Sequence, residues 1–237
     1  KRRRSLSRSK RPLAFYPLSR TEHFSAGGEM APSSYKFTYF NGRGLGETAR
    51  QVFAVAGQKY EDVRIEKEQW EKLKPTTPFG QLPLLEVDGH VIPQSAAIVR
   101  FLAKQFGLYG ANDFEAALID AYMDQYKDFH TEFAKYVYIL RGMKPGDKDA
   151  AWKEHAEPAR DSFFPLIVKQ LKANGTGFIV GSKLSYFDLH LAENVTTTSK
   201  LLPGKLDKYP EVLEFAKRIQ EIPQVKAWIE KRPVTDF

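Results

Sequence analysis

The sequence predicts a small α/β domain followed by an all-helical domain. Between residues 35 and 106, short apolar runs with a two-residue alternation are interleaved with helical stretches. After residue 112 every long segment repeats at the helical period, and glycines and prolines separate the segments. The chain has 237 residues, of which 42% are hydrophobic, and this length and composition suit two small globular domains.

The first domain has the pattern of a βαβ unit followed by a ββα unit. Its expected elements are a strand at 35–40, a helix at 47–56 ended by Gly57, a strand at 60–65, and two strands and a helix within 82–106, with a tight Asp88-Gly89 turn. The expected helices of the second domain are 113–141, 149–173, 185–200, 210–221 and 224–231. We therefore divide the chain into a basic extension at 1–33, an α/β domain at 34–109 and a helical domain at 110–237.

The positive charge is concentrated at the start of the sequence. The net charge is +7 for the whole chain, and residues 1–29 alone carry +6. We therefore expect no nucleic-acid binding by the body of the protein. The Arg- and Ser-rich extension is compatible with a transit peptide, a nuclear or RNA-binding tail, or sequence upstream of a start at Met30. We expect it to be disordered and irrelevant to activity.

The cysteine content, the length of the apolar runs and the spacing of the histidines exclude several kinds of site. The chain has no cysteine, which rules out disulfides, a cysteine nucleophile and thiolate metal sites, and which suits a reducing compartment such as the cytoplasm. No apolar run approaches the roughly 18 residues that cross a bilayer, so we expect no membrane span. The five histidines show no metal-ligand spacing, so no metal site is expected.

The loop NGRGLGE at 41–47 joins a strand to a helix, as phosphate-binding loops do. A dinucleotide fingerprint needs a third glycine where Glu47 stands, and a carboxylate there would occupy the place of a pyrophosphate at the helix N-terminus. After residue 82 the chain also returns as a hairpin instead of a parallel crossover. Nucleotide binding is therefore not expected.

The segment PFGQLPLLEVDG at 78–89 and the helix start at Gln94-Ser95 indicate a site for a small anionic peptide. Proline has no N–H, so Pro83 at a strand entrance fits an edge, a bulge or a cis bond, and the backbone of Leu82 is left to pair with another group. Ser95 stands where an N-cap would, so amide groups and the helix dipole point to one place. A strand edge beside such a helix start suits a peptide that carries a carboxylate.

Tyr39 is the candidate for chemistry at this edge. It stands near the end of the first strand, where open α/β sheets place catalytic groups. By alternation it points with Phe37, opposite Thr38 and Phe40, so the strand alone does not distinguish a core residue from a site residue. Because the chain has no cysteine, any thiol chemistry must use a thiol that the substrate brings.

Together these motifs resemble a cytosolic glutathione S-transferase of the sigma class, related to the haematopoietic prostaglandin D synthase branch. The matching features, from about 35 to 237, are YKFTYFNGRG, Glu47 and Arg50 in the first helix, Trp70 and Lys74, PFGQLP, QSAAI, SYFD at 185–188 and the closing AWIEKRP. The resemblance implies a thioredoxin-like first domain and an all-helical second domain that forms much of the electrophile pocket. It also implies a homodimer, with glutathione as co-substrate and small hydrophobic electrophiles as partners in the reaction.

The resemblance assigns roles to the matching residues. Tyr39 would donate its hydroxyl to the glutathione sulfur. The other expected glutathione contacts are Trp70 and Lys74 at the glycine end, Gln81, Leu82 before a cis-Pro83 at the cysteinyl residue, Gln94 and Ser95 at the γ-glutamyl end, and Asp128 reaching the γ-glutamyl amine in the partner. The expected electrophile pocket consists of Phe40, Arg43, Leu45, Phe129 and Tyr136. Ser185 and Asp188 fit a capping box and are expected to be structural.

Some positions depart from the family pattern. Leu45 stands where sigma-class members often carry an arginine that assists the thiolate, and Arg43 is a candidate substitute. Lys135 and Lys127 replace an aromatic residue and an aspartate of the prostaglandin D synthase branch. We therefore expect conjugation of glutathione to electrophiles, as in detoxification, with two alternatives: a glutathione-dependent prostaglandin isomerase and a non-catalytic carrier of hydrophobic ligands. A carrier would lose Tyr39, and a redox thioredoxin-like enzyme would need a cysteine.

Overall fold

The structure is a computed structural model that describes residues 34–235 of the chain. The basic extension predicted at 1–33 lies outside the described residues. Packing divides the described chain into two compact units, the first formed by 34–41 and 60–94 and the second by 42–59 and 95–235. Within 34–235, no helix has the length and apolarity that a membrane span requires.

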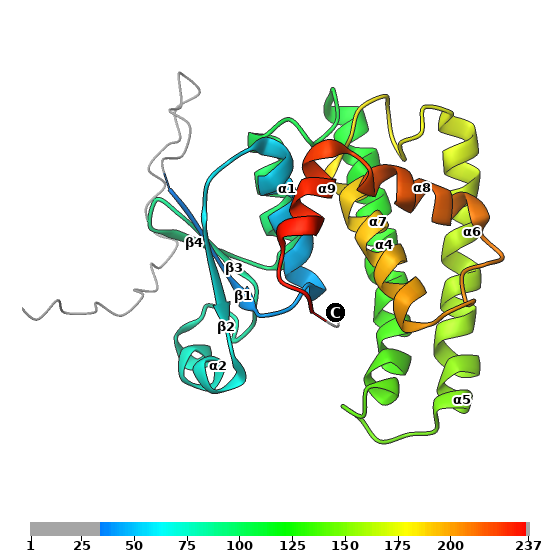
Figure 1. Cartoon of the computed structure of the whole chain (residues 1–237), viewed down its shortest axis with the longest axis horizontal. Helices are drawn as coiled ribbons and strands as arrows, with labels where there is room; N and C mark the ends of the chain where they lie inside the picture. Colours follow the sequence, from blue (N-terminus) through cyan, green and yellow to red (C-terminus); the bar gives the residue numbers. More distant parts are fainter. Residues whose placement is uncertain (1–33, 236–237) are drawn as a thin grey trace, which may run out of the picture. The chain divides into compact units, whose positions relative to one another are not determined.

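The first unit contains a mixed four-stranded sheet. Its strands are β1 (Tyr35–Phe40), β2 (Glu61–Ile65), β3 (Leu84–Val87) and β4 (His90–Pro93), in the order β2-β1-β3-β4 (Figure 1). β1 runs parallel to β2 and antiparallel to β3, and β4 runs antiparallel to β3. The positive φ angles of Asp88 (47°) and Gly89 (87°) form the tight turn between β3 and β4. The predicted strands and hairpin are therefore confirmed.

A short helix after β2, α2 (Lys67–Leu73), was absent from the prediction. Its start is a capping box in which the Glu66 side chain accepts from the backbone of Gln69, while the Gln69 side chain accepts from the Glu66 N–H at 2.8 Å. The signal was the spacing E-x-x-Q. Because a 3-10 turn at Lys74–Thr76 follows directly, Trp70 and Lys74 belong to one short helical segment.

The second unit is built from helices. They are α1 (Glu47–Ala56), α3 (Ser95–Gln105), α4 (Asp113–Leu140), α5 (Lys148–Ala151), α6 (Glu157–Asn174), α7 (Tyr186–Leu201), α8 (Pro210–Gln220) and α9 (Pro223–Lys231), with a 3-10 turn at Gly44–Gly46 before α1. α4 and α6 run side by side, α7 lies beside α8, and α1 packs against α3, α7 and α9 (Figure 1). Since α1 and α3 cluster with the later helices, the domain boundary at 109 stays a prediction.

A π-helical turn before α6 and a capping box at the start of α7 are two local features of the helical unit. The predicted helix 149–173 contains a π-helical turn, Trp152–Ala156, which joins α5 to α6. The predicted capping box at the start of α7 is confirmed, because Ser185 accepts from the Asp188 N–H and the Asp188 side chain accepts from the Ser185 N–H at 2.8 Å. Asp188 also accepts from the Ile179 N–H at 2.9 Å, which fixes the preceding loop.

Candidate functional site

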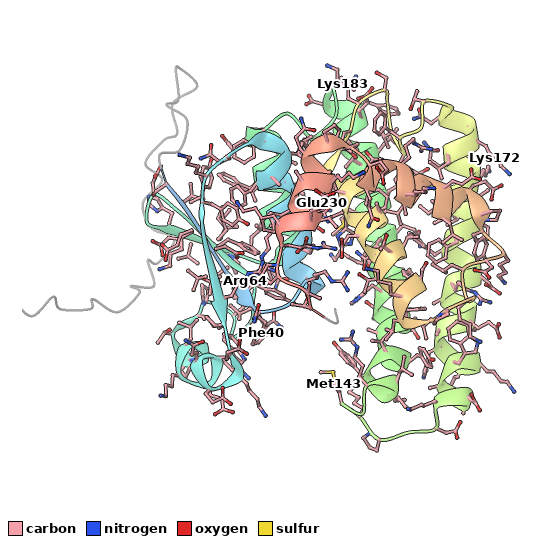
Figure 2. All side chains as sticks on the ribbon, in the orientation of Figure 1. Phe40, Arg64, Met143, Lys172, Lys183 and Glu230 are labelled. Carbon is pink, nitrogen blue, oxygen red and sulfur yellow. The ribbon has the colours of Figure 1, made fainter. Side chains whose placement is uncertain are left out.

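Tyr39 lies where β1 changes from core to partly exposed. Phe37, two residues earlier on the same face of the strand, is fully buried, whereas Tyr39 is half-buried. The Tyr39 ring meets the ring of Phe40 edge to face, with 5.6 Å between the ring centroids. Figure 2 shows the Phe40 side chain at the end of this strand. The face of β1 that carries Phe37 and Tyr39 is therefore fully buried at Phe37 and partly exposed to solvent at Tyr39.

The register of β1 and β3 brings Tyr39 to the proline of the expected peptide-binding segment. The antiparallel ladder ends at the pair Thr38–Leu84. Continuing the same register by one residue sets Tyr39 opposite Pro83. The Leu82–Pro83 peptide bond is cis, as predicted, and Leu82 lies before the first residue of β3. The end of β1 and the backbone of Leu82 thus meet at the same edge of the sheet.

The segment after β2 approaches this edge through Trp70. Its ring contacts the Phe40 ring edge to face at 5.9 Å, which ties α2 to the end of β1. The aliphatic chain of Lys74 lies along Gly80, since a Cβ added to that glycine would be 3.7 Å from the Lys74 chain. Gly80 has a φ of 60°, which favours glycine, and it leads directly to Gln81. Trp70 and Lys74 are therefore positioned by the same sheet edge and loop as Gln81.

Gln81 and Gln94 are joined across the first unit. The Gln94 side-chain amide donates to Gln81 Oε1 at 2.9 Å, and both side chains are exposed. Gln94 has a φ of 74° and immediately precedes α3. The prediction that Ser95 is the N-cap is wrong by one residue: α3 begins at Ser95, because the left-handed bend falls at Gln94. The amide groups of the first turn of α3 still begin at this point of the chain.

Arg43 is engaged inside the helical unit. It is 6% exposed, and its Nη1 donates to Glu193 Oε1 at 2.8 Å. Leu45, in the 3-10 turn before α1, is 42% exposed. The positive charge of Arg43 is thus already matched by a buried carboxylate, which weakens the idea that Arg43 replaces the arginine expected at Leu45.

The candidate residues of α4 divide between surface and core. Asp128 is exposed. Phe129 is 7% exposed and stacks on Phe163 of α6 at 4.8 Å, and Tyr136 is 6% exposed and meets the Trp152 ring at 5.2 Å. These contacts give both rings a packing role between helices. Their place in an electrophile pocket stays a prediction.

The sequence analysis missed a buried charge cluster that links the two ends of the helical unit. Glu47, at the start of α1, is 1% exposed and accepts hydrogen bonds from Trp228 Nε1 (2.7 Å) and Arg232 Nη1 (2.5 Å). Arg232 also donates to Glu193 Oε2 at 2.9 Å. Burial raises the pKa of Glu47 and the Arg232 charge opposes that rise. The motif AWIEKRP contained both donors, but a linear sequence does not show that they reach residue 47.

Comparison with known proteins identifies the family. The sequence matches the family described as "Glutathione S-transferase, N-terminal domain" over residues 35–104 and the one described as "Glutathione S-transferase, C-terminal domain" over residues 127–232. The chain belongs to the glutathione S-transferase family. Probable glutathione S-transferase 5 of Caenorhabditis elegans is 49% identical over 208 residues, which cover 86% of this chain and 99% of the relative. The chain is thus a glutathione S-transferase enzyme, with a thioredoxin-like N-terminal domain followed by an all-helical C-terminal domain.

Solved structures of transferases agree with this fold. A Nu-class enzyme of Haemonchus contortus is 49% identical with a TM-score of 0.80, covering 86% of this chain and 99% of its own. A transferase of Necator americanus that is described as monomeric is 45% identical with a TM-score of 0.83, covering 86% and 100%. Prostaglandin synthase D of Nilaparvata lugens is 36% identical with a TM-score of 0.77, covering 85% and 100%. Within residues 34–235 of the transferase, no group of three or more His, Asp or Glu side chains could hold a metal ion.

Proposed function

We propose that this transferase conjugates glutathione to small hydrophobic electrophiles and that Tyr39 activates the glutathione thiol. The observation that supports this role most directly is the position of Tyr39 at the end of β1. There Tyr39 is half-buried, whereas Phe37 on the same face of the strand is fully buried. Continuing the β1–β3 register by one residue sets Tyr39 opposite Pro83. A tyrosine at this edge can direct its hydroxyl toward a ligand that pairs with the backbone of Leu82.

The chemistry required of Tyr39 is modest. A free thiol has a pKa of about 8.5, so only a few per cent is thiolate at neutral pH, and the thiolate is the nucleophile. A hydroxyl that donates a hydrogen bond to the thiolate stabilises the charged form and lowers that pKa. Each pKa unit corresponds to about 1.4 kcal/mol, so one or two charge-assisted hydrogen bonds suffice for a shift of about two units. The thiolate then forms the carbon–sulfur bond as the electrophile releases its leaving group.

The rest of the glutathione site follows from the same sheet edge. We assign the glycine end of the tripeptide to Trp70 and to the ammonium of Lys74, whose chain lies along Gly80. The γ-glutamyl end would lie at the bonded pair Gln81 and Gln94 and at the first amides of α3, beginning at Ser95. Charged ends of the peptide would thus meet a cation and a helix start.

Tyr39→Phe tests the proposal, with a generic aryl halide as electrophile. Turnover should fall at least tenfold, about 1.4 kcal/mol, whereas glutathione affinity should stay within a few-fold. Tyr35→Phe, the same change earlier on the same strand, is the matched control and should leave turnover within about twofold. Unchanged turnover in Tyr39→Phe would rule out this tyrosine as the activator.

We further propose a homodimer in which Asp128 of α4 completes the site of the partner. Asp128 is exposed, as a residue that crosses to a partner must be in the isolated chain. Sedimentation should give a dimer of 27.1 kDa chains. Asp128→Ala should weaken glutathione binding without dissociating the dimer. One relative is described as monomeric, so a monomer is the alternative result. A fully active monomer would contradict both the dimer and the role of Asp128.

The enzyme class and the reaction each have two candidates that the sequence and the relatives support. The sequence motifs favour the sigma class, and the Nu class of the Haemonchus contortus enzyme is the competing assignment. Prostaglandin isomerisation is the second candidate reaction, supported by the likeness to the Nilaparvata lugens synthase. Lys127 and Lys135 speak against it, because they replace the branch's carboxylate and aromatic side chain and pair locally with Asp124 and Glu132. If the enzyme isomerised a prostaglandin endoperoxide faster than it conjugated an aryl halide, isomerisation would replace conjugation as the favoured reaction. The absence of cysteine favours a cytoplasmic enzyme.

A further inference from the structure

The carboxylate of Glu193, on α7, accepts hydrogen bonds from four side chains of the helical unit. Oε1 accepts from Arg43 Nη1 (2.8 Å) and Thr197 Oγ1 (3.2 Å), and Oε2 accepts from Gln51 Nε2 (3.0 Å) and Arg232 Nη1 (2.9 Å). Each oxygen thus accepts two bonds, which uses about the full acceptor capacity of an ionised carboxyl group. Because Glu193 is buried, bulk water does not compete for these bonds.

Three of these four donors are fixed by helices that pack together. Gln51 lies on α1, Thr197 lies on α7 itself, and Arg232 directly follows α9; α1 packs against both α7 and α9 (Figure 1). The fourth donor, Arg43, lies in residues 42–46, which join β1 to α1 and are called the β1–α1 loop below. Glu193 therefore links this loop to three packed helices.

The backbone of the β1–α1 loop is closed into a 3-10 turn by the same residue that reaches Glu193. The Arg43 carbonyl accepts from the N–H groups of Gly46 (3.0 Å) and Glu47 (2.9 Å). Leu45 lies inside this turn and exposes 42% of its surface. Since the carbonyl and the guanidinium belong to one residue, the placement of the Arg43 side chain and the position of Leu45 are coupled.

The charge of Glu193 acts on the β1–α1 loop more than on α9. Arg43 is buried, and a buried guanidinium is costly when its carboxylate is removed. Arg232 also donates to Glu47 at 2.5 Å, so it keeps a carboxylate if Glu193 is neutralised. Arg43 reaches water by an outward movement of the loop, whose next residue but one, Leu45, is already exposed. Neutral Glu193 should therefore displace the loop while α9 stays in place.

Joining the helices to one another does not require Arg43. Glu47 of α1 accepts from Trp228 of α9, and Glu193 of α7 accepts from Gln51 of α1. These bonds already link α1 to α9 and α1 to α7. The bond from Arg43 adds a different constraint, because it fixes a loop that carries an exposed apolar side chain.

We infer that Glu193 is a positioning residue for the electrophile. Through Arg43 it holds the β1–α1 loop in one conformation, so that Leu45 presents a fixed apolar surface to the electrophile. Glu193 acts through the loop and is not among the residues assigned to either substrate. The inference rests on the proposed function, because Leu45 belongs to the expected electrophile pocket.

Glu193→Gln tests the inference, because it keeps the size of the side chain and removes its charge. With an aryl halide as electrophile, the KM for the electrophile should rise at least about fivefold. The KM for glutathione should stay within about twofold, because the four side chains that bond Glu193 are not among the residues assigned to glutathione. A cluster that only stabilises the fold would lower the melting temperature without this split. An unchanged KM for the electrophile would overturn the inference.

Leu45→Ala identifies the route by which Glu193 acts. Alone, this change should also raise the KM for the electrophile, because it removes the apolar surface that the loop presents. Adding Glu193→Gln to Leu45→Ala should then change that KM by less than about twofold, since both substitutions act through one contact. The same fold-change from Glu193→Gln in both backgrounds would show that Glu193 does not act through Leu45.

Asp161→Asn is the matched control for a general loss of stability. Asp161 of α6 is a comparable carboxylate, which accepts from Arg160 Nε (2.6 Å), Lys208 Nζ (2.6 Å) and Tyr209 OH (2.9 Å). The melting temperature should fall in this variant as in Glu193→Gln, whereas the KM for the electrophile should change by less than about twofold. An equal rise in both variants would mean that any loosening of the helical unit has this effect, and would overturn the inference.

Hydrogen exchange tests the loop without relying on activity. The amide protons of Gly46 and Glu47 should exchange at least about tenfold faster in Glu193→Gln and should be unaffected in Asp161→Asn. Unchanged exchange would overturn the inference. If the unmodified protein does not conjugate the aryl halide, the proposed function fails, and exchange still decides whether Glu193 holds the loop. If Glu193→Gln does not fold, Arg43→Gln, which removes the same ion pair and leaves Glu193 with Arg232, should give the same KM split and the same faster exchange.

Discussion

The indole N–H of Trp228 donates a hydrogen bond of 2.7 Å to the carboxylate of Glu47, a residue 181 positions earlier in the chain. This bond ties α9 to the first residue of α1. Arg232 binds the same carboxylate and continues to Glu193, so the last helix is anchored through buried polar groups rather than through apolar contact alone. Removing one member of such a cluster leaves the others buried without compensation.

Glu47→Ala should therefore lower the free energy of unfolding by about 3 kcal/mol, since Arg232 and Trp228 both lose a buried acceptor. Trp228→Phe keeps an aromatic side chain but replaces the indole with a smaller ring that has no N–H, and should cost at least about 1 kcal/mol. Glu230→Ala removes an exposed carboxylate on α9 and is the control, with an expected change of less than about 0.5 kcal/mol (Figure 2). Urea unfolding measures all three, and a Glu47→Ala protein as stable as the control would show that the cluster contributes nothing.

Two buried groups of α7 should give the stability opposite dependences on pH. Burial lowers the pKa of His190 to about 3, and the neutral ring shares a hydrogen bond of 2.8 Å with Thr48. Burial raises the pKa of Asp188 to about 6, against the lowering effect of its bonds from Ser185 and Ile179. The contribution of His190 is complete above pH 6.5 and is lost as the pH falls toward 3. The contribution of Asp188 is complete below about pH 3.8 and is lost as the pH rises through 6.

Variants separate the two effects between pH 6 and pH 4. The stability advantage of the unmodified protein over His190→Gln should shrink by about 1.4 kcal/mol for each unit that the pH falls. Its advantage over Asp188→Asn should grow at a similar rate. Guanidinium unfolding at several pH values in this window gives both differences. Parallel changes for the two variants would mean that at least one group titrates normally in the folded protein.

Local signals predicted much of the fold correctly. Both β1 and α1 were predicted with the bounds that the structure has, because the alternation of Tyr35 and Phe37 and the stop at Gly57 are local properties. Gly57 has a φ of 63°, which glycine adopts without penalty. The helix α2 was missed since it has seven residues, none of them buried, and therefore no periodic apolar face. A capping pair is a weaker signal than a buried stripe.

The candidate site was predicted in part for the same reason. The cis bond before Pro83 and the helix start beside Gln94 depend on residues that are adjacent in the sequence. The register that sets Tyr39 opposite Pro83 depends on how β1 pairs with β3, which no short motif encodes. The burial of Arg43 against Glu193 joins positions 150 residues apart. The sequence analysis placed Arg43 in the electrophile pocket, whereas the structure pairs it with Glu193 of α7.

Gln81 and Gln94 should act as one unit in glutathione binding. Gln81→Ala and Gln94→Ala should each raise the KM for glutathione roughly three- to tenfold, with little change in kcat, because both act on a part of the substrate remote from the sulfur. The double variant should lose less than the two singles together, since the amides bond each other at 2.9 Å. Gln58→Ala, whose amide bonds the neighbouring Lys59 carbonyl, is the control. Full additivity would show that the two amides act independently.

The basic extension should be dispensable for catalysis. Residues 1–29 carry a net charge of +6, and none of the residues assigned to the glutathione or electrophile site lies among them. A protein that begins at Met30 should keep its turnover and its melting temperature. The same truncation should abolish salt-sensitive binding to nucleic acid or anionic vesicles, because the remaining residues carry a net charge of only +1. Loss of activity on truncation would mean that the extension packs on the body. Retained salt-sensitive binding would mean that a basic surface lies elsewhere.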